Sequence, residues 1–166
     1  MTRDTLETPL GPMLAMAGPN GLSLLEWTDD ANRAEQAIAR LARHGAVDGE
    51  GDLGPIRAWL AAYYAGRFDA LPEVALDPRG TDFELQVWAE LRRVRLGHTT
   101  TYGELARTLG KPASAARAIG AAVGQNPLAV VVPCHRVIGK DGGLVGFAGG
   151  LERKAWLLRH EGALLL

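Results

Sequence analysis

The stretch Asp77–Gly80, with the sequence Asp-Pro-Arg-Gly, divides this 166-residue chain into two parts. A proline and a glycine two positions apart continue neither a helix nor a strand easily, so the stretch predicts a boundary between structural units. The charge changes at the same place: residues 1–78 carry 6 basic and 12 acidic side chains, and residues 79–166 carry 12 basic and 7 acidic ones. The net charge of -1 therefore hides an acidic first domain and a basic second domain that can meet a polyanion.

The overall composition is that of a globular chain, with 47% hydrophobic and 22% charged residues. No apolar run approaches the roughly 18 residues of a membrane span, and the N-terminus has no apolar targeting segment. The single cysteine, Cys134, excludes an intrachain disulfide and a cysteine-rich zinc site. We therefore expect a cytoplasmic protein that makes no membrane contact and binds no metal.

Residues 1–78 have the pattern of an α/β unit. Two apolar runs, Met13–Ala17 and Leu22–Trp27, flank the turn-forming sequence Gly18–Gly21, which predicts a β-hairpin. Apolar side chains then recur at helical spacing in two segments, residues 34–41 and 56–64. Nothing in this part has a catalytic pattern, and its acidic loop residues lack the spacing of metal ligands.

Residues 79–166 are predicted to be mainly helical. Thr81–Glu84 has the form of a capping box, opening a helix that we expect to end near Gly97. Thr101–Glu104 repeats this form, and Pro112 can start a further helix that runs to Val123. The last two helices have helix-turn-helix form. Helical hairpins without DNA-binding activity share this form, so it leaves both readings open.

The second of these two helices has an unusual surface. Within residues 114–123, five alanines and Gly120 leave Arg117 as the only charged side chain. Such a surface suits close approach to a partner with one long side chain reaching out. Tight packing against the neighbouring helix would require small residues as well.

The environment of the only thiol is the most informative part of the sequence. The apolar run Leu128–Val132 predicts a buried strand that Pro133 ends, so Cys134 would be held at the end of that strand. A reactive cysteine needs a base or a positive charge nearby, and His135 and Arg136 can supply either. Taken alone, the residues favour an inert buried thiol and a structural histidine.

The surrounding sequence resembles the O6-alkylguanine-DNA alkyltransferases, also called methylated-DNA–protein-cysteine methyltransferases. The resemblance covers residues 81–162 in order and at matching spacing, with a highly specific Pro-Cys-His-Arg-Val core. Its motifs are Thr101–Ala106, Ala115–Gly120, Asn126–Gly139, Gly146–Gly150, Lys154, Trp156–Leu158 and His160–Gly162.

The resemblance implies a fold and a reaction. The fold is an N-terminal α/β domain with a ribonuclease H-like sheet, residues 1–78, and a mainly α C-terminal domain with a helix-turn-helix, residues 79–166. The reaction is DNA repair by direct, irreversible, single-turnover transfer of an alkyl group from guanine O6 in duplex DNA, with O4-alkylthymine as a further candidate substrate. It needs no cofactor.

The resemblance also implies residue roles in catalysis. Cys134 would be the nucleophile, His135 would take its proton through a water molecule, and Glu161 would orient His135. Asn126 would tie the recognition helix to the active-site loop. Tyr102 would crowd the phosphate next to the flipped nucleotide and contact its base.

For DNA, the resemblance implies minor-groove binding by a protein that is monomeric in solution, with cooperative binding along DNA left open. Arg117 would enter the base stack in place of the flipped nucleotide. The residues expected at the DNA are Tyr102, Ser114, Ala115, Arg117 and Ala121. Those expected around the flipped base are Val137, Phe147, Ala148 and Gly149, with the Val137 carbonyl accepting from the guanine amino group and the Ala148 amide donating to O6.

Three alternative functions remain at this point. Alkyltransferase-like proteins that only flag the lesion carry tryptophan at the position of Cys134, so the cysteine disfavours that class. A helix-turn-helix transcription regulator would prefer a sequence on undamaged DNA. A hydrolytic cysteine enzyme would turn over repeatedly.

Overall fold

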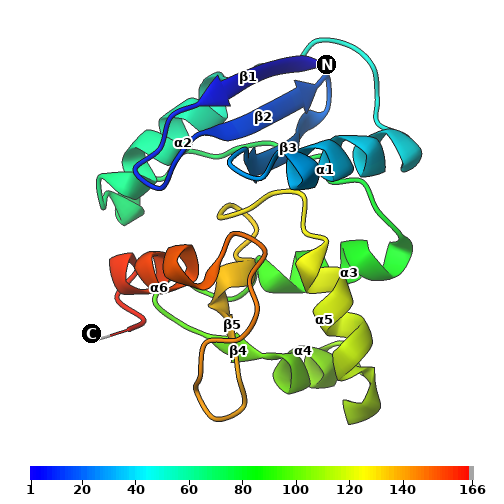
Figure 1. Cartoon of the computed structure of the whole chain (residues 1–166), viewed down its shortest axis with the longest axis vertical. Coiled ribbons are helices and arrows are strands. Elements are labelled where there is room, and N and C mark those ends of the chain that lie inside the picture. The colour runs from blue at the N-terminus through cyan, green and yellow to red at the C-terminus, as the bar shows by residue number, and fades with distance from the viewer. Residues whose placement is uncertain (165–166) are drawn as a thin grey trace. The chain divides into compact units, whose positions relative to one another are not determined.

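The computed structural model describes residues 1–164 and contains two compact units, Met1–Gly80 and Thr81–Leu166 (Figure 1). The division falls two residues after the predicted boundary, within the same Pro- and Gly-bearing stretch. No helix among the described residues is long and apolar enough to cross a bilayer.

The first unit is built on a three-stranded antiparallel sheet in the order β1-β2-β3. Its strands are β1 (Thr2–Leu6), β2 (Met13–Gly18) and β3 (Gly21–Trp27). The β2–β3 pair confirms the predicted hairpin. Strand β1 is not predicted by the sequence pattern, because three of its five residues are exposed and polar and form no apolar run.

Two helices accompany the sheet: α1 (Ala31–Arg43), which contacts β3, and α2 (Gly54–Tyr64). Both confirm the helices predicted from spacing. Asp30 caps α1 by accepting a hydrogen bond from the Arg33 amide. Leu41 of α1 packs with Leu14 and Leu24 of the sheet to form a buried cluster. A one-turn helix, η1 (Phe68–Ala70), follows.

The edge of β3 pairs with the segment that leads out of this unit. The Leu22 amide donates to the Ala75 carbonyl at 2.8 Å, and the Asp77 amide donates to the Leu22 carbonyl at 2.8 Å. Gly21 makes this approach possible, since a Cβ atom there would lie 2.5 Å from the Ala75 oxygen.

The second unit consists of short helices around a two-stranded parallel sheet. Its elements are α3 (Asp82–Leu91), β4 (Thr100–Thr101), α4 (Tyr102–Thr108), η2 (Ala113–Ala115), α5 (Ala116–Gly124), η3 (Cys134–Arg136), β5 (Val137–Ile138) and α6 (Leu151–His160). Helices α4 and α5 contact each other, as the helix-turn-helix prediction requires. Trp88 of α3 donates from Nε1 to the Ala122 carbonyl of α5 at 2.8 Å, which joins those two helices.

Helix α3 begins where the sequence predicts and ends earlier. The capping box of Thr81 and Glu84 is complete. The helix ends at Leu91 rather than near Gly97, and the chain continues in tighter turns, with the Val94 amide donating to the Leu91 carbonyl. The Val94 carbonyl accepts a hydrogen bond from Arg136, so it is satisfied without a further helical turn.

Candidate functional site

The segment that leads to Cys134 is a buried loop and not the predicted strand. Within residues 125–133 the backbone turns repeatedly, the Val132 amide bonding back to the Leu128 carbonyl at 2.9 Å. Val130 adopts a φ of 71°, which no regular strand contains. The run is apolar because most of it is buried, and periodicity alone cannot distinguish a buried turn from a buried strand.

Asn126 holds this loop in place. Its side-chain nitrogen donates to the Val132 carbonyl at 2.9 Å, and its side-chain oxygen accepts from the Leu128 amide at 3.0 Å. Asn126 follows directly after the cap of α5. It therefore links the end of α5 to the residues just before Cys134, the position that the resemblance implies.

Cys134, His135 and Arg136 form the single turn η3, and all three are buried. His135 Nε2 lies 2.7 Å from Glu161 Oε2, and both side chains are inaccessible to solvent. Glu161 is the C-cap of α6, 26 positions away in sequence. The structure thus brings together the predicted base and the predicted orienting carboxylate.

The charges of this pair define a tautomer. Burial raises the pKa of Glu161, but hydrogen bonds from His135 and Arg136 outweigh it and hold the pKa at about 2. Burial lowers the pKa of His135, and Glu161 opposes this only in part. Glu161 is therefore a carboxylate that accepts, and neutral His135 donates from Nε2–H. The lone pair is then on His135 Nδ1, which is buried and has no hydrogen-bond partner within residues 1–164.

Lys154 is a buried charge that belongs to the family motif but has no role predicted from the sequence. Its Nζ donates to the carbonyls of Val137, at 2.5 Å, and Val145, at 2.8 Å, and the residue is fully buried. Burial lowers its pKa to about 8, while the charge of Cys134 acts in the opposite direction. By the same electrostatic interaction, the Lys154 cation favours the thiolate form of Cys134. The signal available in the sequence was one lysine beside the apolar residues of α6.

Tyr102 is the first residue of α4 and lies close to the thiol. Burial raises its pKa, and the charge of Cys134 adds to that effect. Its ring also packs against α5, where a Cβ atom on Gly120 would lie 3.7 Å from Tyr102 Cε1. Tyr102 thus belongs to the helix-turn-helix, contacts α5 and interacts electrostatically with Cys134.

The predicted DNA face of α5 is largely open to solvent. Ser114, Arg117 and Ala121 are exposed and Ala115 is half-buried, whereas Ile119, Ala122 and Val123 form the buried side. Both explanations of the alanine-rich surface, approach to a partner and packing against the neighbouring helix, therefore hold, but for different residues. Ala122 packs inside, and Ala118 and Ala121 face outward.

The loop before α6 carries the other residues predicted around the base. The ring of Phe147 stands nearly perpendicular to that of His135, with centroids 6.5 Å apart. Ala148 is exposed, and the Gly149 carbonyl accepts from Arg153 Nη1 at 3.2 Å. The Val137 carbonyl already accepts from Lys154, and a second lone pair remains on that oxygen.

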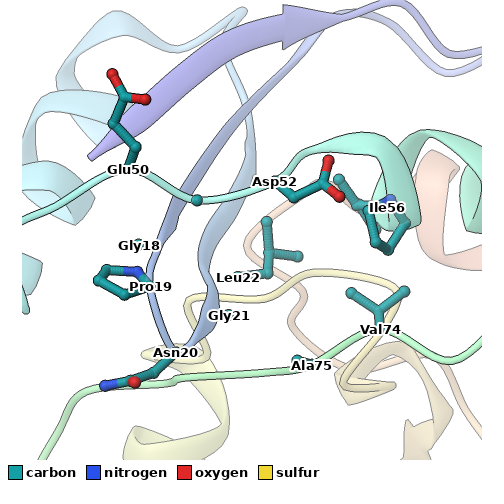
Figure 2. A pocket seen from close by; sticks show the side chains of 12 residues that line it. Gly18, Pro19, Asn20, Gly21, Leu22, Glu50, Asp52, Ile56, Val74 and Ala75 are labelled. Atoms are coloured by element: carbon teal, nitrogen blue, oxygen red, sulfur yellow. The ribbon is translucent and has the colours of Figure 1, made fainter.

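A cavity of about 440 Å³ lies within the first unit, and no predicted site residue lines it (Figure 2). Its acidic residues, Glu50 and Asp52, lie on the segment before α2. Asp52 already accepts a hydrogen bond from the Gly54 amide at 2.8 Å. Among the described residues, no three His, Cys, Asp or Glu side chains are grouped to hold a metal ion.

Known sequences resemble this chain over its whole length. The family model for the 6-O-methylguanine DNA methyltransferase DNA-binding domain matches residues 82–163. The methylated-DNA–protein-cysteine methyltransferase of Salmonella typhimurium is 42% identical, over 100% of this chain and 98% of its own. The protein of the same name from Mycobacterium tuberculosis is 43% identical, over 95% of this chain and 90% of its own.

Solved structures resemble it as well. The crystal structure of Mycobacterium tuberculosis OGT in complex with DNA aligns with a TM-score of 0.78 and 39% identity, covering 96% of this chain and 91% of that one. The O6-methylguanine-DNA methyltransferase of the archaeon Pyrococcus kodakaraensis aligns with a TM-score of 0.69 and 25% identity, covering 96% and 98%.

Proposed function

The chain belongs to the family of methylated-DNA–protein-cysteine methyltransferases, which repair DNA by alkyl transfer, and we propose that Cys134 is the residue that accepts the alkyl group. The Cys134 sulfur attacks the alkyl carbon on guanine O6, a new S–C bond forms, and the O6–C bond breaks. The guanine leaves unmodified, and the thioether is not reversed. Each molecule therefore acts once.

The observation that carries this proposal is the buried pair His135–Glu161 beside the thiol. With Nε2–H held by Glu161, His135 Nδ1 can take the thiol proton through a water molecule. Lys154 adds a positive charge that stabilises the thiolate. The proton lost by sulfur passes to His135. The guanine leaves as an anion whose oxygen accepts a hydrogen bond from the Ala148 amide, and it becomes neutral guanine by taking a proton from water, to which His135 returns its own.

The base must leave the stack to reach a buried thiol. In our proposal the exposed face of α5 enters the minor groove, because its small side chains permit close approach. Arg117 fills the gap left by the flipped nucleotide, and Tyr102 contacts the neighbouring phosphate and the base. Ser114, Ala115 and Ala121 lie along the DNA backbone on either side of Arg117.

The pocket for the flipped guanine is assigned to the residues on either side of the thiol. The second lone pair of the Val137 carbonyl accepts from the guanine amino group, and Phe147 and Gly149 border the ring. Asn126 fixes the position of the loop before Cys134 relative to the end of α5. The same pocket admits O4-alkylthymine as a poorer substrate.

Several further features of the proposal rest on the family resemblance. We assign residues 1–78 to a supporting α/β domain and residues 79–166 to DNA binding and transfer. Three antiparallel strands with a parallel neighbour at Leu76 support a ribonuclease H-like sheet. We expect a protein that is monomeric in solution and acts on duplex DNA inside the cell without a cofactor.

Methyl transfer to the protein tests this function. With duplex DNA that carries labelled O6-methylguanine, the label should move to the protein up to one equivalent. Cys134→Ser should abolish the transfer and keep DNA binding, since an alcohol is far from its alkoxide at neutral pH. Transfer by the serine variant would overturn the nucleophile assignment, and repeated turnover would favour a hydrolytic enzyme.

A further inference from the structure

We propose that Arg136 is a positioning residue for the transfer reaction, whose guanidinium fixes the Glu161 carboxylate between His135 and the end of α3. The inference rests on the proposed function, because it concerns how the base of that reaction is held. The mechanism described above gives Arg136 no part, although it stands two positions after the thiol.

The contacts of Arg136 are specific. Its Nε donates to Glu161 Oε1 at 2.8 Å, and its Nη1 donates to the Val94 carbonyl at 2.7 Å. The other carboxylate oxygen, Oε2, is bonded to His135. Each oxygen of Glu161 therefore accepts from a buried side-chain donor, and the carboxylate cannot rotate without breaking a charge-assisted hydrogen bond.

Val94 gives this arrangement a fixed anchor. It follows the end of α3, in turns that bond back to the helix. Through Nη1, Arg136 is bound to the backbone that follows the end of α3, and through Nε it is bound to the cap of α6. The base is thus positioned from two helices that are distant in sequence.

The charge of Arg136 also matters for the protonation of His135. A carboxylate at the C-terminal end of α6 meets the negative end of the helix dipole, and a cation beside it offsets that repulsion. The charged groups that act on His135 are Glu161, which raises its pKa, and Arg136 and Lys154, which lower it. Without Arg136, the Glu161 charge would be opposed by Lys154 alone, so His135 would be protonated at a higher pH.

A purely structural role for Arg136 makes a different prediction. Loss of packing would slow the reaction equally at every pH. Loss of the positioning role would slow it most where His135 has become protonated, and the rate would recover as the pH rises. The pH profile therefore distinguishes the two roles.

The experiment uses the full chain and O6-benzylguanine, a free base that needs no DNA. Arg136→Gln should lower the rate at neutral pH by about tenfold and move the midpoint of the acid limb upward by about one pH unit. Arg93→Gln, which removes an exposed guanidinium next to Val94, is the matched control and should change neither value. A uniform fall across the profile, or no fall, would overturn the proposal.

Arg136→Lys keeps the experiment decisive if the glutamine variant does not fold. Lysine keeps the charge but lacks the fork that reaches both Glu161 and Val94. Because the charge is kept, it should leave the midpoint of the acid limb close to that of the unmodified protein, whatever the change in rate. A midpoint that moves upward by about one pH unit would refute the role of the Arg136 charge. Transfer by the unmodified protein in the same assay tests the proposed function separately.

Discussion

Lys154 Nζ donates a hydrogen bond to the backbone carbonyl of Val137, three residues after the thiol. The same ammonium group donates to the Val145 carbonyl, so one buried cation holds both ends of the loop between them. Val137 begins β5, which pairs with β4 just before Tyr102. Three parts of the site therefore depend on one side chain of α6.

Replacing Lys154 by methionine tests this dependence. Lys154→Met keeps the length of the side chain and leaves two buried carbonyls without their donor. We expect the free energy of unfolding to fall by about 1–3 kcal/mol and the transfer to O6-benzylguanine to slow. Urea unfolding and the transfer rate measure the two effects. Lys140→Met, at an exposed position of the loop, should change stability by less than about 0.5 kcal/mol. Equal stability of the two variants would contradict the assignment.

Glu161 makes stability depend on pH. Its pKa is about 2 in the folded protein against an ordinary 4.5, so its contribution is fully present above about pH 5 and is lost as the pH falls toward 2. His135, whose pKa is also lowered, acts in the same direction below its ordinary 6.5. The unfolding free energies of the unmodified protein and Glu161→Gln should therefore converge between pH 6 and pH 3, by on the order of 2 kcal/mol. Denaturant titrations between pH 6 and pH 3 check this, and a constant difference would exclude an ionised Glu161 as its cause.

Much of the second unit could be predicted from local sequence signals. Thr81 and Thr101 mark the starts of α3 and α4. Each side chain accepts from a backbone amide within the first turn of its helix, so the capping signal is contained in a few consecutive residues. The loop before Cys134 could not be predicted in this way. Its backbone groups are satisfied by the side chain of Asn126, and an apolar sequence does not record that contact.

The same limit explains other differences. In the second capping box, the Glu104 carboxylate accepts from Thr100 Oγ1 instead of from the Thr101 backbone amide. Helix α3 ends at Leu91, and the turns beyond it present the Val94 carbonyl to Arg136, 42 positions away in sequence. The pair His135–Glu161 was expected only through the family resemblance, since nothing local joins residues 26 positions apart.

Arg117 gives a prediction that concerns DNA and not the chemistry. It is exposed on α5, so its loss should leave the fold unchanged. Arg117→Ala should slow repair of O6-methylguanine in duplex DNA by about tenfold or more, because only that reaction requires a flipped nucleotide. The rate with O6-benzylguanine should change by less than about twofold. Parallel rate measurements on the two substrates check this, and equal losses on both would count against a role in flipping.

Arg107→Ala provides the matched control for Arg117→Ala, since it removes an exposed arginine from α4, the other helix of the helix-turn-helix. If Arg107 contacts phosphate, its loss should weaken binding to all DNA sequences and reduce the salt dependence of the affinity. At saturating DNA, the ratio of the rates on duplex DNA and on O6-benzylguanine should stay unchanged.

The most direct test of the central claim is the mass of the protein after one reaction. Incubation with excess duplex DNA containing O6-methylguanine, followed by intact-mass measurement and peptide mapping, should show one methyl group per molecule, on Cys134. The DNA should then contain one equivalent of restored guanine. Unmodified Cys134, a methyl group on another residue, or repair beyond one equivalent would contradict the account.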